Sequence, residues 1–471
     1  MFRSIRQAFV QPSWSFAALF SGAVLLFLAV FAWRFADERL YADSGYYLAR
    51  VINEGSFRVE HGRWVLALSQ VLPLIGVKLG LPLTVLIKLH SLNNVAWLAG
   101  CLLAAWKLGD RTAMVALAAV HLVGLTHGLF CPIFELYYGV DLLILFQAVL
   151  ANDRLRPRLR WPLLIALFLV VLSSHMFAML LMAGWLVLHR VWRDRRLTIT
   201  LASLFVVNGL LRAFTISDYE KDHLSFVHRF TDPEALWRIV SPHRLFDLLA
   251  YTLRHYPDVL LLALASTFFL IMRRQRLTLF VFVGMLAVFH VLIAMKIPDL
   301  VHDRYREQVN FVVTSWAVLV FCFHALYSKD REPLLTLLLV GSIVFRVAQA
   351  EWIASYYEMR TGLTESRITV ARQHGLHKAI VSSPVYFGPE HDAIDLSWST
   401  SVESLLLSAK AGPGSTVSLI TREDAEVPEV AAGLDRFVFR RWDVFDPEWL
   451  DERYFNMPAG TYEPLPNDPG P

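Results

Sequence analysis

The sequence has little charge and little cysteine for its length. Only 18% of its 471 residues are charged, and the formal net charge is +3 at pH 7. This balance indicates neither a nucleic acid nor an acidic substrate as a partner. The three cysteines, Cys101, Cys131 and Cys322, lie inside or beside apolar segments and have neither metal-cluster spacing nor an obvious disulfide partner. We interpret them as packing residues.

The N-terminus lacks a cleavage site, and the chain lacks internal repeats. Arg3 and Arg6 precede an apolar run at 16–33 that is long enough to cross a hydrocarbon core of ~30 Å, which predicts a retained first helix with its cytoplasmic end first. The chain shows no inverted repeat and no paired helices broken by glycine or proline. Their absence disfavours a transporter with a central pathway.

Apolar residues are abundant. They make up 56% of the chain, which contains 14 Trp and 32 Phe and has a mean hydropathy of +0.46. This composition predicts a polytopic membrane protein. The apolar runs lie at about 16–33, 64–80, 83–106, 112–130, 133–151, 161–189, 197–211, 258–272, 277–297, 310–327 and 334–354.

Basic loops set the predicted topology, because cytoplasmic loops are rich in Lys and Arg. These loops are RLRPRLR (154–160), RVWRDRR (190–196), RRQR (273–276) and the weaker KDR (329–331). Placing them inside requires 161–189 to be two short helices hinged near SSHMF and 64–80 to be a juxtamembrane helix, which gives about 11 transmembrane helices. The alternative treats 161–189 as one helix and 64–80 as a span, but it leaves RLRPRLR outside.

The composition changes after Glu351. Gly, Pro, Ser, Asp and Glu become frequent, and short β-rich runs appear in KAIVSSPVYFG, STVSLITR and RFVFRRWDVF. We therefore predict an all-α transmembrane domain at 1–355 with outer loops at 37–63, 212–257 and 298–309. Residues 356–471 are predicted to form a small extracytoplasmic α/β domain with a disordered tail.

The first outer loop is polar directly after the first apolar run. On a helix starting at Asp43, Tyr46 and Tyr47 follow at i+3 and i+4, on the same face as the acid. An ionisable residue at the membrane boundary needs a wet cavity and a partner, so this face is one candidate site. Alternatively, Asp43 is the N-cap of the helix and accepts backbone N–H groups.

The segment THGLFCPIFELYYGVD forms a second polar junction and carries His127, Glu135 and Asp141. Glu135 either favours the positive N-terminus of the following helix or takes part in a site. Asp141 lies about two turns into an otherwise apolar helix, where a structural and a functional role are both open. The two acids point to different faces, which disfavours one shared ion.

Two further outer segments carry candidate residues. His175 in LSSHMFAML is either a hydrogen-bonded core histidine or part of a site. In VHDRYREQVNF, Arg304, Tyr305 and Arg306 precede a span. These charges are either solvated or, together with Arg63, hold a phosphate, for which the guanidinium fork is well suited.

The arrangement resembles the C-type (GT-C) glycosyltransferase superfamily, polytopic enzymes that use polyprenyl-phosphate-linked sugars and include protein O-mannosyltransferases and lipid A aminoarabinose transferases. The resemblance rests on Asp43 in YADSGYYLA, the juxtamembrane run LPLIGVKLGLP, the acids Glu135 and Asp141, and the Arg304–Tyr305 pair. It covers roughly residues 16–327. The chain departs from the pattern in having Asp-Ser where many relatives have Asp-Glu, and in lacking a proline after Arg-Tyr.

The resemblance implies an inverting transferase in a bacterial inner membrane, with its C-terminal domain on the periplasmic or extracellular side. It implies Asp43 as general base, with Glu135 and Asp141 as further catalytic acids. The implied substrate-binding residues are Tyr46, Tyr47, Arg63, His127, His175, Arg304, Tyr305 and Arg306. The donor would be a polyprenyl-phosphate-linked sugar and the acceptor a glycan, glycolipid or protein. A divalent metal, Mg²⁺ or Mn²⁺, would assist, although no ligand spacing is diagnostic.

Two other functions stay open. A lipid-linked oligosaccharide polymerase or ligase also needs outer arginines, but the early Asp-Tyr loop favours the monosaccharide transferase. A non-enzymatic scaffold would interact through its outer domain. The transferase predicts acids and arginines around one outer cavity, whereas the scaffold predicts scattered positions.

Overall fold

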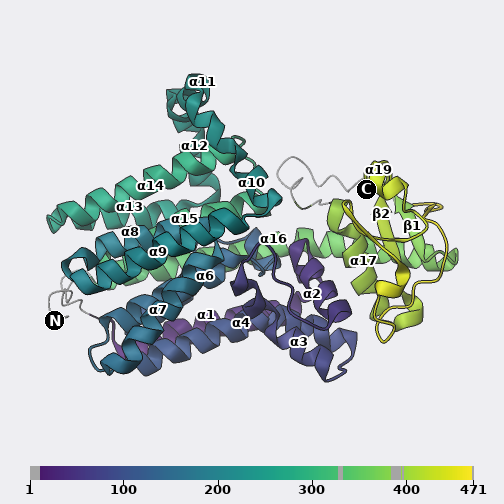
Figure 1. Cartoon of the computed structure of the whole chain (residues 1–471), viewed down its shortest axis with the longest axis horizontal. Helices are drawn as coiled ribbons and strands as arrows, with labels where there is room; N and C mark the ends of the chain where they lie inside the picture. The colour runs from purple at the N-terminus through teal and green to yellow at the C-terminus, as the bar shows by residue number, and fades with distance from the viewer. Residues whose placement is uncertain (1–10, 327–331, 383–393, 395–396, 469–471) are drawn as a thin grey trace.

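Apolar helices form most of the chain, as the composition predicts. The computed structural model describes residues 11–326, 332–382, 394 and 397–468. Its long helices lie side by side, with the C-terminal strands at one end of the bundle (Figure 1). Seven described helices are long and apolar enough to cross a membrane, or eight if a bent pair forms one span. These helices indicate a membrane-embedded protein.

The seven long apolar helices are α1 (Trp14–Arg34), α4 (Leu83–Leu108), α7 (Pro157–Ser174), α9 (Arg195–Thr215), α14 (Arg276–Lys296), α15 (Arg304–Val320, continued by the π-helical turn Phe321–Ala325) and α16 (Glu332–Gln373). The bent pair is α12 (Pro242–His255) and α13 (Pro257–Met272), with an angle of 109°. The other helices of the membrane part are α2 (Asp43–Glu54), α3 (Val71–Lys78), α5 (Arg111–Val120), α6 (Glu135–Ala151), α8 (Met176–Leu188), α10 (Asp218–Leu224) and α11 (Pro233–Val240).

The predicted count of about 11 spans is not confirmed. The ten residues of α5 extend about 15 Å at 1.5 Å per residue, half of a ~30 Å hydrocarbon core. The chain then turns into the 3₁₀ helix η4 (His127–Phe130). Residues Glu135 to Leu150 of α6 are all buried. The apolar character of these two segments therefore reflects contact with protein, which hydropathy alone does not separate from contact with lipid.

Residues 161–189 form two helices, as predicted. His175 lies between α7 and α8 with an extended backbone, φ −155° and ψ 151°. Its Nδ1 accepts a hydrogen bond from the Phe177 backbone N–H at 3.1 Å, which caps α8. Residues 64–80 likewise form two short helices, the 3₁₀ helix η3 (Trp64–Gln70) followed by α3.

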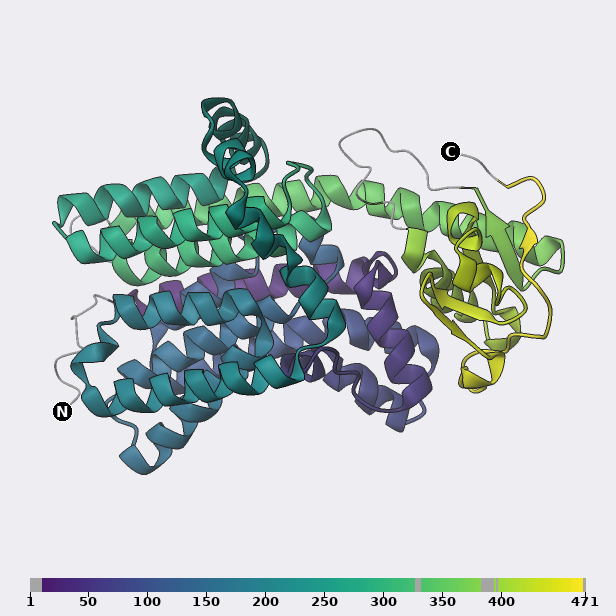
Figure 2. The same cartoon turned by 45° about the horizontal axis from the view of Figure 1, so that its top comes forward.

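The C-terminal residues form a small unit of strands and helices. β1 (Lys378–Val381) pairs in parallel with β2 (Ser418–Thr421) and β5 (Glu463–Pro464), while β3 (Phe437–Arg440) pairs antiparallel with β4 (Asp443–Phe445). The helices of this unit are α17 (Thr400–Ala409), α18 (Arg422–Ala425) and α19 (Pro428–Ala431). The predicted boundary at 355/356 falls inside α16, which runs from the bundle to the strands (Figure 2).

The C-terminal unit shares an apolar core with the first outer loop. Leu48 and Ile52 of α2 are fully buried in one cluster with Leu406 of α17 and Phe439 of β3. Gly45 fits α2 against the preceding turn, because a Cβ at this position would lie 2.3 Å from the Leu40 carbonyl oxygen. The C-terminal unit is therefore packed against the loop that carries Asp43.

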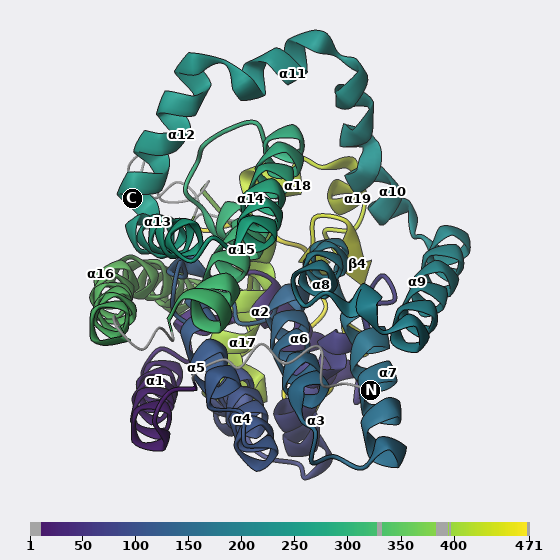
Figure 3. The same ribbon diagram turned by 90° about the vertical axis from the view of Figure 1, so that its left-hand side faces the viewer.

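The predicted outer loop at 212–257 is largely helical. Its helices α10, α11 and α12 connect the end of α9 to the start of α13, and they form an arch beside α14 (Figure 3). α11 packs against α14 through an apolar cluster that includes Ile239 and Met295.

Candidate functional site

A polar cavity of about 480 Å³ lies where the bundle helices meet the C-terminal unit. Residues from α2, α6, α15 and the α7–α8 break contribute to its wall. The predicted site residues among its lining are Asp43, Tyr47, Arg63, Glu135, His175, Arg304 and Tyr305. Segments far apart in the sequence therefore place acids and arginines around one space.

Asp43 and Arg304 form an ion pair in this cavity, through Oδ2 of the acid and Nη1 of the arginine. The Arg304 side chain is almost fully buried, whereas that of Asp43 is 36% exposed. The N-cap of α2 is Ala42, so the interpretation of Asp43 as the N-cap is wrong. Asp43 occupies the first turn instead, with its carboxylate turned to Arg304.

The backbone next to Asp43 is strained and held by the C-terminal unit. Ala42 has φ 56° and ψ −130°, a conformation that favours glycine. Its backbone N–H donates to Oε1 of Glu403 at 3.2 Å. Glu403, on α17, also pairs with Arg360 of α16. The C-terminal unit thus fixes the orientation of the acid at the cavity wall.

Arg63 forms a second buried ion pair. Its Nη1 donates to Oε1 of Glu135 at 2.8 Å, and its Nε lies 3.6 Å from Oε1 of Glu220. Burial acts to lower the Arg63 pKa, but the two carboxylates outweigh burial and raise the pKa above its ordinary value. Arg63 is therefore a permanent cation at the cavity wall.

Glu60 forms hydrogen bonds with two tyrosines of α2. It accepts hydrogen bonds from the hydroxyls of Tyr46 and, at 3.4 Å, Tyr47. Burial is the main cause that raises the Tyr46 pKa to about 12, against the opposing effect of Arg440. Tyr46 therefore stays protonated and donates to Glu60, while the Arg440 guanidinium lies 4.0 Å from the centre of its ring. Tyr46 does not line the cavity itself, but it contacts the lining residues Glu60 and Arg440.

Several lining residues were not predicted. Lys296, at the end of α14, places its ammonium 5.7 Å from the Tyr305 ring. The C-terminal unit adds Arg440 and the rings of Trp398 and Trp442, whose centres are 5.9 Å apart. Lys296 ends an apolar run, while Arg440 is the last residue of β3 and Trp442 lies in the turn before β4, so no local sequence signal separates them from ordinary boundary residues. The remaining unpredicted lining residues are Glu60, His61, Ile133, Phe134, Tyr219, Gln308 and Val309.

Besides Tyr46, three predicted site residues lie away from the cavity lining. Asp141 is completely buried and accepts hydrogen bonds from Trp97 Nε1 at 2.9 Å and from His121 Nε2 at 3.0 Å. His127 Nδ1 lies 3.0 Å from the Tyr357 hydroxyl. The third residue, Arg306, donates to the Ile297 carbonyl oxygen. These contacts engage all three side chains outside the cavity lining.

Glu307 anchors the start of α15. Its fully buried carboxylate accepts hydrogen bonds from the backbone N–H groups of Thr126 (2.8 Å), His127 (3.1 Å) and Gly128 (2.6 Å). Arg304 precedes Glu307 by three residues, so the two lie on neighbouring positions of one helical face. Anchoring Glu307 to η4 therefore also positions Arg304.

The described residues contain no group of three His, Cys, Asp or Glu side chains placed to hold a metal ion. In the cavity, Asp43 and Glu135 each pair with an arginine, and Glu60 accepts from tyrosines. These residues do not fit the divalent metal site that the resemblance implies.

No protein-family model matches the chain, and neither a curated protein nor a solved structure is similar enough to match it. The resemblance to GT-C glycosyltransferases therefore stays a prediction, and the geometry of the cavity has to support a function by itself.

Proposed function

We propose that the chain is a membrane glycosyltransferase that moves a sugar from a polyprenyl-phosphate donor to an acceptor hydroxyl, with inversion at the anomeric carbon. The observation that carries the proposal is the Asp43–Arg304 pair in a cavity bordered by bundle helices and the C-terminal unit. The proposed setting is a bacterial inner membrane, with this cavity on the periplasmic or extracellular side.

In this proposal the donor phosphate binds at Arg63 and Lys296. Both residues line the cavity, and the phosphate would displace or share the contact that Arg63 now makes with Glu135. Cations at this position stabilise the negative charge that develops on the leaving phosphate. The isoprenoid tail would lie against the neighbouring apolar helices.

Asp43 acts as the general base. The acceptor oxygen attacks the anomeric carbon as its proton passes to the Asp43 carboxylate, and the bond between this carbon and the phosphate oxygen breaks. Polyprenyl phosphate leaves with the electron pair of that bond. The partial exposure of Asp43 supports this role, and the ion pair with Arg304 orients the carboxylate.

The C-terminal unit contributes to acceptor binding. Aromatic faces offer large apolar surfaces with defined geometry, and Trp398 and Trp442 present two of them to the cavity. Because sugar rings have apolar faces of similar size, a glycan or glycolipid acceptor suits this wall better than a protein.

The test is transfer of radiolabelled sugar from polyprenyl-phosphate donors to glycolipid or polysaccharide acceptors by purified full-length protein. Wild type should transfer, Asp43→Asn should lose transfer, and Asp141→Asn is the matched control that should keep it. Full transfer by a folded Asp43→Asn protein would remove Asp43 as the base. No transfer by wild type with any polyprenyl-phosphate sugar would count against the whole proposal.

A lipid-linked oligosaccharide polymerase or ligase is the second candidate. Lys296 and Arg440 add two cations to the arginines that the sequence predicts, which suits a pyrophosphate donor. Transfer from a polyprenyl-pyrophosphate oligosaccharide, without transfer from a polyprenyl-phosphate sugar, would favour this candidate.

A further inference from the structure

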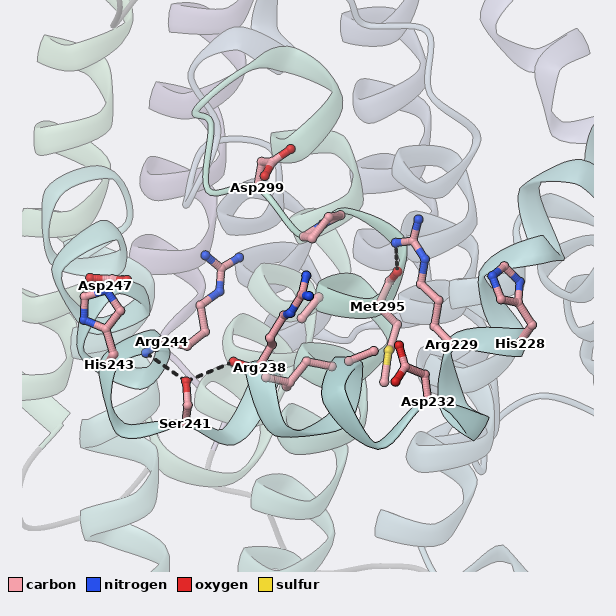
Figure 4. Close-up of a pocket in the computed structure, with 14 residues that line it drawn as sticks. His228, Arg229, Asp232, Arg238, Ser241, His243, Arg244, Asp247, Met295 and Asp299 are labelled. Carbon is pink, nitrogen blue, oxygen red and sulfur yellow. Dashed lines mark hydrogen bonds and ion pairs between the residues drawn. The ribbon is translucent and has the colours of Figure 1, made fainter.

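A second cavity, of about 730 Å³, lies between the arch of α11 and α12 and the end of α14 (Figure 4). Its walls also include the end of α14, at Ala294 and Met295, and the following residues Pro298 and Asp299. It shares no lining residue with the cavity proposed for transfer. The two cavities are close neighbours, because Met295 lines one and Lys296 lines the other.

Charges of both signs line this second cavity. The guanidinium groups of Arg229, Arg238 and Arg244 extend toward its interior, and Asp299 faces them from the opposite wall (Figure 4). The other two acids in the lining, Asp232 and Asp247, lie on the arch beside the arginines, so the lining holds three arginines and three aspartates whose formal charges cancel. Arg238 also pairs with Glu234, which lies outside the lining. A ligand that carries both a positive and a negative group matches this balance better than an anion alone.

Two of the acids already have partners. Oδ1 of Asp232 accepts the Glu234 backbone N–H at 2.9 Å and caps α11, and Oδ2 of Asp247 lies 3.5 Å from Nε2 of His243. Asp299 is exposed at the upper edge of the cavity in Figure 4. It is the acid best placed to accept hydrogen bonds from a ligand.

The arch has an apolar outer surface. Trp237 of α11 is 63% exposed, and Phe246 of α12 is 70% exposed, on positions that do not line the cavity. A helix with a charged face and an aromatic, apolar face lies in the interface of a bilayer. Phe280 and Val283 on α14 are also exposed, along the side of a helix long enough to span the membrane. If α11 and α12 lie in the interface and α14 crosses the bilayer, the cavity at the end of α14 would be at the level of the lipid headgroups.

We propose that this cavity binds the headgroup of a zwitterionic phospholipid with a primary amine, of the phosphatidylethanolamine type. Arg238 and Arg244 hold the phosphate through guanidinium hydrogen bonds, with Arg238 sharing or leaving its present contact with Glu234. The ammonium group donates to Asp299, and the acyl chains run along α14. Lipid binding at this site does not require transfer in the neighbouring cavity.

Native mass spectrometry of the full-length protein in detergent tests the proposal. Phosphatidylethanolamine, phosphatidylcholine and phosphatidylglycerol with identical acyl chains are added in turn. Wild type should retain phosphatidylethanolamine about tenfold better than the other two, because choline has no N–H donor and glycerol has no positive charge. The R238Q/R244Q variant should lose this retention. Asp299→Asn should bring phosphatidylethanolamine down to the level of phosphatidylglycerol.

Arg254→Gln is the matched control, since Arg254 lies on α12 outside the cavity lining and should leave retention unchanged. Equal retention of the three lipids by wild type would overturn the proposal, as would unchanged retention by a monodisperse R238Q/R244Q protein. If that variant aggregates, Asp299→Asn decides alone, because Asp299 is exposed and its substitution should leave folding unchanged. Displacement of the lipid by equimolar inorganic phosphate would also overturn the proposal, since it would show a simple anion site.

Discussion

Asp43 and Asp141 are both acids in predicted outer segments, yet the regions around them differ. The Asp43 side chain is 36% exposed and faces a polar cavity, with Arg304 as its partner. Asp141 is completely buried between Trp97 and His121. Both acids have partners from distant segments, but only Asp43 has space beside it for a ligand. Access, rather than residue type or neighbouring charge, separates the candidate catalytic acid from the structural one.

The largest expected effect is on the free energy of unfolding, and it concerns the buried Asp141. Asp141→Ala leaves the Trp97 and His121 nitrogens buried without an acceptor, so the free energy of unfolding should fall by about 3 kcal/mol. Denaturant titration in detergent measures this change. Asp43→Asn is the comparison variant and should cost less, because its side-chain oxygen still accepts from the buried Arg304 guanidinium and its own site is open to water. Equal losses for the two variants would contradict the contrast between the regions.

The second largest effect is expected on catalysis, and it concerns the Asp43–Arg304 pair in the cavity. Arg304→Gln removes the partner that orients Asp43, so kcat for sugar transfer should fall on the order of 10²-fold with little change in stability. Arg306→Gln, two residues along α15 and outside the cavity, should leave kcat within about twofold. A normal kcat in folded Arg304→Gln protein would show that the ion pair has no part in the reaction.

A smaller effect is expected at the C-terminal wall. Trp442→Ala should raise the acceptor KM about three- to tenfold, as expected for loss of one aromatic stacking contact, and leave the donor KM unchanged. Trp192, an exposed tryptophan far from the cavity lining, provides the control variant Trp192→Ala. An equal rise in both KM values would indicate a general distortion of the cavity rather than a lost acceptor contact.

The smallest effect concerns pH. Burial, reinforced by Arg63, lowers the His61 pKa from its ordinary value of 6.5. The unfolded chain then binds a proton more readily than the folded chain, so His61 makes stability fall as pH drops below about 6.5. His61→Gln should flatten this part of the curve of melting temperature against pH. An unchanged slope in the variant would assign the pH dependence to other groups.

The sequence was a good guide to the helix break at His175 and to the C-terminal strands. The pair of short helices around His175 follows from the need to keep basic loops on one side, and the terminal strands follow from β-rich runs. The pattern failed to settle whether α5 and α6 cross the membrane, because an apolar segment buried in a bundle has the same composition as one in lipid. It also failed for the cap of α2, since Ala42 adopts a strained conformation that its identity does not suggest.

The residues that line the cavity were only partly predictable from local sequence patterns. Asp43, Arg63 and Arg304 stand out in sequence, because charged residues beside apolar runs are costly without a role. Lys296, Arg440 and Trp442 do not stand out, because the end of an apolar run, the end of a strand and a turn between strands are ordinary positions for such residues. Their part in the site depends on α14 and the C-terminal unit reaching the same space.

The sequence by itself determined that this is a helical, membrane-embedded protein with a small C-terminal unit, since hydropathy and strand patterns are local properties of the chain. Only the tertiary structure decided which charged residues face a cavity and which are sealed inside the bundle. It also showed that the C-terminal unit fixes the backbone beside Asp43 through Glu403. The contact between Ala42 and Glu403 joins residues 361 positions apart, and it depends on packing geometry that no local pattern encodes.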